Sequence, residues 1–186
     1  LTIGTSGFDQ SSGTFNGTTN NMIVNGSFNI SGGTFNATSG TLTLNSTISI
    51  LGSSFIHGNG TVELKYVAAN VTNVNFYHLK LNNTNHVLTI AGSLVVSGSL
   101  YLDNLNQING APIYIYGSIT FTDTNWSGTS KIVLTGTAYQ SITGSGVCGV
   151  PLEINKTSNS ANVSVNLTIT NNSDLILTLG VLNAGN

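Results

Sequence analysis

Apolar and polar residues alternate in short segments along the whole chain. The clearest segments place two apolar residues two positions apart, as in Leu42 and Leu44 and again in Val62 and Leu64. Because successive side chains of an extended strand point to opposite faces of a sheet, this spacing indicates strands with one buried face. Ser-Gly, Asn-Gly and Gly-Gly pairs separate the segments and are typical of turns. The pattern therefore predicts many short β-strands.

These segments repeat between positions 12 and 71 with a fixed period of about 20 residues. Phenylalanine recurs at Phe15, Phe35 and Phe55, and each is preceded by Thr or Ser. Asparagine recurs with the same period, at positions 16 and 36 and at positions 25 and 45. Beyond residue 71 the period loosens to about 19–22 residues, but alternating segments continue. Three consecutive copies in register predict a repeat architecture.

Two architectures contain many short, evenly spaced strands: a sandwich of hairpins and a β-solenoid. Only a solenoid requires like residues at a fixed period, because each coil lies over the previous one and stacks equivalent side chains. The sequence predicts an all-β, parallel β-helix of about nine coils, with about 20 residues per coil, as a single domain over residues 1–186. Phe15, Phe35 and Phe55 are expected to form an internal ladder in its core, and the aligned asparagines to form ladders at turns. Whether a coil has two or three faces stays open.

Composition supports this fold and excludes several other classes of protein. Asn, Thr, Ser and Gly supply 95 of the 186 residues, and only 5% of residues are charged. Because four Lys without any Arg cannot neutralise a phosphate backbone, no nucleic-acid partner is expected. No apolar run approaches the ~20 residues of a membrane span, so no membrane insertion is expected. Poor helix formers dominate, and the low charge limits repulsion between stacked side chains.

Two short motifs carry a resemblance to a known group of proteins. Residues 12–16 (Ser-Gly-Thr-Phe-Asn) and 39–45 (Ser-Gly-Thr-Leu-Thr-Leu-Asn) resemble the β-helical repeats of large secreted surface proteins of bacteria and archaea. Adhesin passengers of the filamentous-haemagglutinin kind and surface-filament repeats belong to this group. The resemblance covers most of the chain and implies an extracellular or cell-surface location, an adhesive or structural role and no cofactor. It carries over no catalytic residue.

Neither end of the sequence shows the polar or helical cap that usually closes a solenoid. An uncovered end presents unpaired strand edges and apolar core residues, which favour pairing with another chain. Either the chain is a segment of a longer array or separate copies stack end to end, with small local caps as the remaining alternative. We expect copies of the same chain as partners, through end strands that carry Leu1, Ile3, Leu175, Leu177, Leu179 and Leu182.

The six carboxylates are spread along the chain, and the best candidate for a catalytic pair is Asp103 with Asp123, one repeat period apart. A carbohydrate-cleaving β-helix needs carboxylates that converge on one face, often with Arg or Lys. No Arg exists and no Lys is expected in register with this pair, so we expect solvated turn carboxylates, with a weak cation contact as the alternative. Glu63 and Lys65 are expected to form an exposed ion pair of little energetic consequence. No catalytic residue is predicted.

Histidine and cysteine give no metal site or disulfide within the chain. His57 and His78 lie close to one repeat period apart and are expected to stack on the surface. Zinc needs three or four convergent ligands, and His86 has no clear place in that column. Cys148 has no second cysteine to pair with, so we expect it to be buried as a small apolar residue, with an intersubunit disulfide as the alternative. No metal or cofactor is predicted.

Two features bear on glycans as partners. Tyr101, Tyr114 and Tyr116 occupy outward positions and are candidates for a strip that stacks on sugars, although packing against a neighbouring segment is commoner. The chain also contains 13 N-x-Ser/Thr triplets, which accept N-glycans only in an exported protein. These candidates are Asn16, Asn25, Asn29, Asn36, Asn45, Asn59, Asn70, Asn82, Asn125, Asn155, Asn162, Asn166 and Asn171.

Together these features favour a non-enzymatic, secreted structural protein. In this interpretation the chain is a self-assembling β-solenoid subunit of an extracellular filament, sheath or surface layer, which stacks end to end through its open edges. The first alternative is the rigid stalk of a cell-surface adhesin. The second is a carbohydrate-binding or depolymerising β-helix. Assembly of the isolated chain distinguishes the first interpretation from the stalk, and a groove in which acids and bases meet would favour the last.

Overall fold

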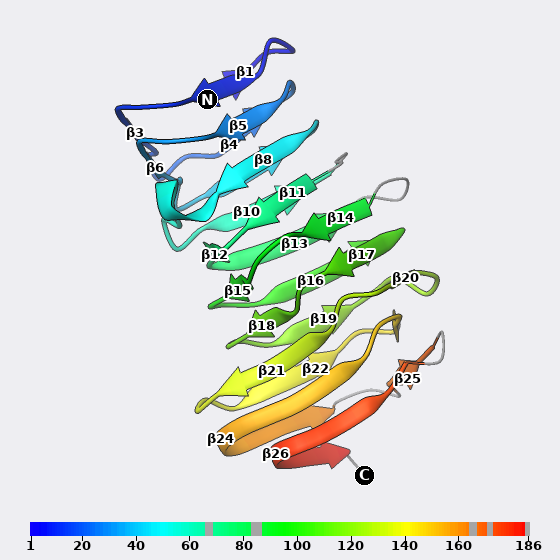
Figure 1. Cartoon of the computed structure of the whole chain (residues 1–186). Coiled ribbons are helices and arrows are strands. Elements are labelled where there is room, and N and C mark those ends of the chain that lie inside the picture. The colour runs from blue at the N-terminus through cyan, green and yellow to red at the C-terminus, as the bar shows by residue number, and fades with distance from the viewer. Residues whose placement is uncertain (66–68, 83–86, 164–166, 171–172, 185–186) are drawn as a thin grey trace.

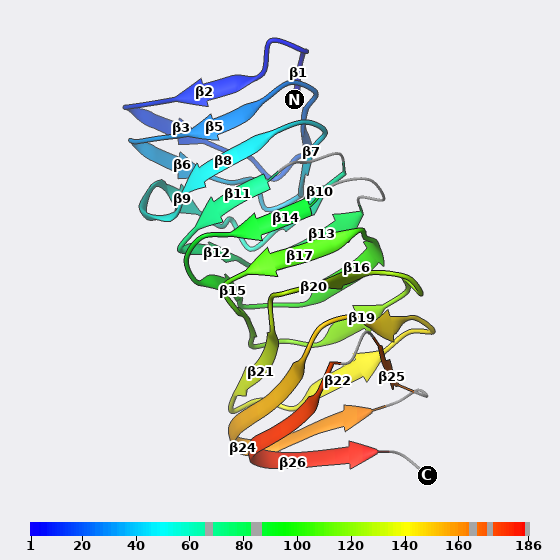
Figure 2. The same ribbon diagram turned by 45° about the vertical axis from the view of Figure 1, so that its right-hand side comes forward.

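The chain forms a parallel β-solenoid, in which the backbone winds repeatedly around one axis (Figure 1). A computed structural model describes residues 1–65, 69–82, 87–163, 167–170 and 173–184. Its strands pair in parallel, with about eight turns of about 20 residues each, followed by a last winding made by the second half of β24 with β25 and β26. The two ends of the chain lie at opposite ends of the stack (Figure 2). The fold class expected from the repeat is confirmed.

Each turn has three faces, which the sequence left undecided. The first face contains β1 (Thr2–Ile3), β4 (Met22–Val24), β7 (Thr41–Leu44), β10 (Thr61–Leu64), β13 (His78–Asn82), β16 (Leu100–Asn104), β19 (Ile119–Phe121) and β22 (Gln140–Thr143). The second contains β2 (Phe8–Gln10), β5 (Phe28–Ile30), β8 (Ile48–Leu51), β11 (Ala69–Thr72), β14 (Val87–Ile90), β17 (Gln107–Gly110), β20 (Ser127–Gly128), β23 (Val147–Cys148) and β25 (Thr168–Ile169). The third contains β3 (Thr14–Asn16), β6 (Thr34–Asn36), β9 (Phe55–Ile56), β12 (Val74–Phe76), β15 (Leu94–Val96), β18 (Ile113–Ile115) and β21 (Ile132–Gly136).

Two long strands form the last turns at the C-terminal end and run around a corner of the solenoid. β24 (Leu152–Val163) pairs with β21 through its first half, on the third face, and with β22 through its second half, on the first face. β26 (Leu175–Ala184) pairs along β24 in the same way, with an interrupted register at the corner. Asn159 and Gly180 adopt positive φ angles of 59° and 99° there, a conformation open mainly to Gly and Asn. The corner therefore joins two faces into one continuous sheet.

The alternating pattern has a direct structural cause. Leu42 and Leu44 point into the solenoid and are each 1% exposed, whereas Thr43 between them points outward. The strand register places Leu44 directly between Val24 and Leu64 of the neighbouring turns. Each inward position thus contacts its equivalents above and below, so apolar columns run along the axis and form one core.

The phenylalanine repeat forms an aromatic column inside this core. The ring centroids of Phe15 and Phe35 lie 4.8 Å apart and those of Phe35 and Phe55 lie 5.7 Å apart, with nearly parallel planes. Phe8 and Phe28 stack at 5.4 Å in a second column, whose rings meet the first column edge to face. Both arrangements are favourable for aromatic pairs. The second column was missed because Phe28 is followed in the next turn by Ile48 rather than by another ring.

Asparagine ladders lie on the outside of the same turns. The Asn36 amide donates to the Asn16 side-chain oxygen at 2.7 Å, and the Asn45 amide donates to Asn25 at 2.8 Å. The spacing of the repeat had indicated both pairs. Asn29 likewise donates to the Asp9 carboxylate at 3.0 Å. These bonds join one turn to the next without using the backbone.

Candidate functional site

Apolar core positions are exposed at the C-terminal end of the solenoid. Leu175 and Leu177 of β26 pair with Leu152 and Ile154 of β24, which are fully buried. The two terminal leucines are nevertheless 48% and 58% exposed, because no further described strand lies over them. Leu179 and Val181 are about as exposed, whereas Leu182 packs partly against the core. The last winding therefore presents an apolar surface with an unpaired strand edge.

The N-terminal end has the same character. Leu1 is 65% exposed, while Ile3 packs partly against the core. Phe8 and Phe15 form the outermost rings of the two aromatic columns and are only partly buried, whereas Phe28 and Phe35 behind them are buried. The described residues include one short 3₁₀ helix, Gly52–Ser54, which lies between β8 and β9 and covers neither end. The two ends are thus chemically alike and lie at opposite ends of the rod.

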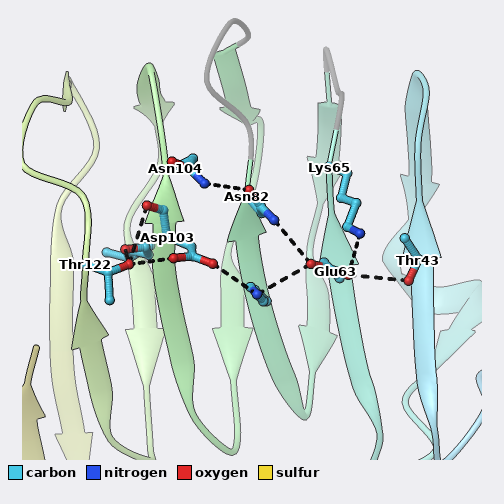
Figure 3. Close-up of polar contacts among 9 residues, drawn as sticks. Thr43, Glu63, Lys65, Asn82, Asp103, Asn104 and Thr122 are labelled. Atoms are coloured by element: carbon cyan, nitrogen blue, oxygen red, sulfur yellow. Dashed lines mark hydrogen bonds and ion pairs between the residues drawn. The ribbon is translucent and has the colours of Figure 1, made fainter.

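A polar cluster on the first face is the second candidate site (Figure 3). The Lys80 ammonium lies 3.0 Å from the Asp103 carboxylate and 3.6 Å from the Glu63 carboxylate. Lys65 lies 3.6 Å from Glu63 on the other side. The Thr122 hydroxyl donates to Asp103 at 2.7 Å. Four of the ten charged side chains of the chain are thus gathered on neighbouring turns of one face.

The strands place these residues outward at positions that alternate with the core. Lys80 lies between buried Leu79 and Leu81, and Asp103 follows buried Leu102. The Lys80 contact was not predicted from the sequence. Equivalent residues of β10 and β13 are separated by fewer residues than the repeat period, whereas those of β13 and β16 are separated by more. These unequal steps remove the regular register on which the expectation rested. No lysine was expected in register with Asp103 and Asp123. Lys80 is in register with Tyr101 but nevertheless contacts Asp103, so the expectation of an Asp103 without a lysine neighbour is wrong.

Hydrogen bonds fix the charge states of the cluster. The Thr122 hydroxyl and the Lys80 ammonium lower the pKa of Asp103 below its ordinary value. The bond to Asp103, together with the charges of both carboxylates, raises the pKa of Lys80. Near neutral pH the pair is held as carboxylate and ammonium. A general acid in sugar hydrolysis needs the opposite shift, a carboxyl with a raised pKa.

Asp123 does not join Asp103 in a catalytic pair. Its carboxylate accepts hydrogen bonds from the backbone N–H groups of Leu105 and Asn125, and so fixes the turn. Asp103 is bonded instead to Lys80 and Thr122. Solvated turn carboxylates were expected, with a weak cation contact as the alternative; instead each of the two carboxylates has its own partners within the protein. Glu63 is also less exposed than expected, since its side chain is 13% accessible between Lys65 and Lys80.

A hollow of about 410 Å³ lies beside this cluster. Its lining residues are Thr61, Lys80, Tyr101, Leu102, Asp103, Thr120 and Thr122. Tyr101 is 38% exposed and lies between Lys80 and Thr120 in the strand register. We call this hollow, in which the Tyr101 ring lies among threonine, Lys80 and Asp103 side chains, the trough.

The other tyrosines do not continue this trough. Tyr114 lies on β18 of the third face, and Tyr116 follows that strand. They are 37% and 48% exposed. A single strip with Tyr101 was expected because all three point outward, but Tyr101 belongs to the first face. The strip is therefore divided between two faces.

The histidines and the cysteine have structural environments. The His57 ring neighbours Tyr77 at 5.6 Å, and Tyr77 in turn meets His78 edge to face at 4.5 Å, so a direct histidine stack is replaced by an intervening tyrosine. The Nδ1 atom of His78 accepts a hydrogen bond from the Ser99 N–H at 2.8 Å. Cys148 is fully buried, and burial raises the pKa of its thiol to about 12. Burial was the expected state, and it leaves no exposed thiol for an intersubunit disulfide. His86 lies outside the described residues.

Lys156 is a buried cation that the sequence gave no reason to expect. It is 0% exposed on β24, at the corner beneath Gly180. Its ammonium donates to the Ala138 carbonyl at 2.7 Å and to the Gln140 side-chain oxygen at 2.5 Å. Burial lowers the pKa of Lys156. These bonds hold the corner of the last turns together.

The N-x-Ser/Thr candidates differ in whether the asparagine amide nitrogen donates a hydrogen bond and in how exposed the residue is. Asn29, Asn36, Asn45 and Asn82 use their amide nitrogens as donors to the preceding turn. Asn16, Asn25, Asn59, Asn70 and Asn125 are exposed, and Asn155 and Asn162 are half-buried. Asn166 and Asn171 lie outside the described residues. The exposed group offers the most accessible amide nitrogens for modification.

Comparison of the chain with protein-family models, with curated proteins and with solved structures finds no match. Among the described residues, no three His, Cys, Asp or Glu side chains converge as ligands for a metal ion. No helix in the described part of the chain is long and apolar enough to cross a membrane. The class that the fold defines is the parallel β-solenoid. Its two candidate sites are the open ends and the polar cluster on the first face.

Proposed function

We propose that the chain is a non-enzymatic structural protein of the cell surface, which assembles end to end into a filament, sheath or surface layer. The observation that carries this proposal is the continuation of the apolar columns to both ends, where Leu177 is 58% exposed and Phe15 is only partly buried. Placing one end on the other would bury these side chains and pair the open strand edges. An extracellular location belongs to the same proposal and is supported by the resemblance of the repeats to secreted surface proteins.

The strand order at the two ends supports a specific way of stacking. The outermost strands at the C-terminal end are, in chain order, β25 on the second face and the two halves of β26 on the third and first faces. The next position along the helical path therefore lies on the second face. A second copy begins with β1 on its own first face. The strands of the second copy continue the stack without a gap only when that copy is rotated about the axis so that its first face lies over the second face of the copy before it.

In this arrangement the core-facing side chains at the end of one copy contact core-facing side chains at the end of the next copy. β1 lies over β25, so that Ile3 meets Ile169 and Thr2 meets Thr168; both isoleucines pack against the core. β2 lies over the first half of β26, which places Phe8 near the exposed leucines. β3 lies over the second half of β26 and places Phe15 near Leu182. Without the rotation, β1 would contact the second half of β26, but a gap one strand wide would separate the two copies on the other two faces.

Hydrogen-bond polarity supports head-to-tail stacking. In the pairs Asn16–Asn36, Asn25–Asn45 and Asn162–Asn183 the amide of the later residue donates to the earlier one. A second copy placed head to tail continues this direction, whereas head-to-head contact reverses it at the junction. A head-to-tail contact does not close on itself and produces an open filament.

Negative-stain electron microscopy of the purified chain tests the proposal. We expect rods much longer than one subunit for the unmodified chain, and short rods for Leu177→Lys, which places a charge in the end surface. Thr89→Lys is the matched control, since Thr89 is exposed on the side of the rod, and it should form filaments like the unmodified chain. Discrete short rods of the unmodified chain at every concentration would overturn the proposal and favour the adhesin stalk. Normal filaments of Leu177→Lys would exclude this end surface as the contact.

A further inference from the structure

The trough beside Tyr101 has features that end-to-end stacking does not use. It lies on the side of the rod, on β10, β13, β16 and β19 of the first face, with further turns on both sides of it. Its position means that a filament would display it once per subunit. We propose that this trough binds a neutral oligosaccharide of pyranose units.

Tyr101 supplies the stacking surface. Its side chain is 38% exposed and forms one wall of the hollow, with Thr120 on the neighbouring strand. A partly exposed tyrosine ring offers an apolar face together with a hydroxyl group at its tip. The apolar C–H face of a pyranose ring packs against such a surface, while its hydroxyls stay available for polar groups. Besides the Tyr101 ring, the lining offers three threonine hydroxyls and the charged groups of Lys80 and Asp103.

Lys80 and Asp103 supply a donor and an acceptor side by side. Each is about one third exposed, and the ammonium and carboxylate lie 3.0 Å apart. The Asp103 oxygens each receive one bond, from Thr122 and from Lys80, and retain further acceptor capacity. Neighbouring hydroxyls of a sugar ring both donate and accept, so one hydroxyl can bond the carboxylate while the next accepts from Lys80. Bonds to charged groups are stronger than bonds between neutral groups.

Charge balance selects a neutral ligand over an acidic one. The carboxylates of Glu63 and Asp103 are matched by the ammonium groups of Lys65 and Lys80. The cluster has no excess positive charge with which to attract uronic acids, sulfated sugars or phosphates. Since both lysines are already paired, an acidic ligand would also have to compete with their carboxylate partners.

Saturation-transfer NMR followed by calorimetry tests this proposal. The probes are hexaoses of β-1,4-linked glucose, N-acetylglucosamine, xylose and mannose, with polygalacturonate as the acidic counterpart. We expect at least one neutral hexaose to bind, and Tyr101→Ala and Asp103→Asn each to weaken it at least tenfold. Tyr114→Ala is the matched control, because Tyr114 is as exposed as Tyr101 but lies on another face, and it should bind normally.

Each other result would overturn the proposal. These results are binding of no neutral hexaose, binding of polygalacturonate alone, or equal losses in Tyr101→Ala and Tyr114→Ala. Circular dichroism of each variant confirms that the solenoid is intact before binding is compared. Because binding is measured on the side of the rod and filament formation by microscopy, failure of this proposal and failure of end-to-end assembly are distinguishable.

Discussion

At the residue scale, stacking of like side chains explains the unusual composition. A column of Phe, Leu or Val gains contacts above and below each member, and a column of Asn gains a hydrogen bond between turns. A column of charges would repel itself, which accounts for the 5% charged residues. The exceptions are informative, because Lys80 and Lys131 each lie beside a carboxylate of another turn. At these two positions charges of opposite sign meet, whereas Asp123 and Lys156 bond to uncharged groups.

Removal of the central ring should destabilise the solenoid strongly. Phe35 is 0% exposed and contacts rings on both neighbouring turns. We expect Phe35→Ala to lower the free energy of unfolding by about 3–5 kcal/mol, because it removes buried apolar area and leaves a cavity. Urea denaturation measures this change, with exposed Thr89→Ala as the control at less than about 0.5 kcal/mol. Equal effects of the two substitutions would contradict the aromatic column.

Acid should destabilise the C-terminal turns through Glu153. Hydrogen bonds from Lys131 and Thr178 lower the pKa of Glu153 below its ordinary value of 4.5. The unfolded chain then binds more protons than the folded chain as the pH falls, so the stabilisation present above pH 4.5 is lost towards the folded pKa. We expect the urea midpoint to fall between pH 5 and about pH 3. Glu153→Gln should make that fall shallower, and an unchanged fall would contradict the assignment.

At the element scale, strands of two to five residues make up most of the rod. Such strands are marginal alone and depend on pairing with the turns above and below. The backbone at each corner also lies close to the backbone at the corner of the neighbouring turn, which restricts the residues that a corner can contain. At Gly144, which follows β22, φ is +99° and an added Cβ would lie 1.9 Å from the Phe121 carbonyl oxygen. Glycine is required there by both conformation and space.

A methyl group at this corner should therefore be costly. We expect Gly144→Ala to lower the free energy of unfolding by about 1–3 kcal/mol, because the backbone is strained and the neighbouring turn must move. Gly4→Ala is the control, since nothing lies within 4 Å of its added Cβ and its φ is not positive. Thermal or urea unfolding measures both variants. Similar stability of the two would contradict the close approach of the corners.

At the scale of the whole molecule, the solenoid has a direction along its axis. Its first described strand lies on the first face, and its last also ends on the first face. A copy added without rotation would therefore place two first-face strands, the second half of β26 and β1, one after the other. A rotation by one face between copies restores the regular order. The repeat alone does not contain this information.

Engineered cysteines test the rotation directly. Thr2→Cys with Thr168→Cys joins copies in the rotated arrangement, whereas Leu1→Cys with Ala184→Cys joins them in the unrotated one, in which β1 would lie over the second half of β26 and Leu1 over Ala184. We expect disulfide-linked oligomers under mild oxidation for the first pair only, because Thr2 and Thr168 then lie on adjacent strands. Native Cys148 is fully buried and does not interfere. Cross-linking of the second pair alone would contradict the rotated register.

Much of the fold could be predicted from the sequence because residues 12–71 repeat with a fixed period. Phe15, Phe35 and Phe55 share one environment, so their spacing gives the period and the inward face. The cluster around Lys80 could not be predicted in this way. The number of residues from β10 to β13 is smaller than the repeat period, and the number from β13 to β16 is larger. The local sequence pattern does not show which residues of these turns become neighbours. The corner at Lys156 was missed because a lysine in a polar segment normally indicates an exposed position.

The sequence by itself determined the strand pattern, the period of about 20 residues and the apolar columns, since these follow from side-chain alternation and stacking between neighbours. Only the tertiary structure decided that each turn has three faces, that Tyr101 and Tyr114 lie on different faces, and that Lys80 bridges Glu63 and Asp103. The physical reason is that corner geometry depends on the turn below as well as on the local residues. Small differences in corner length then decide which side chains meet.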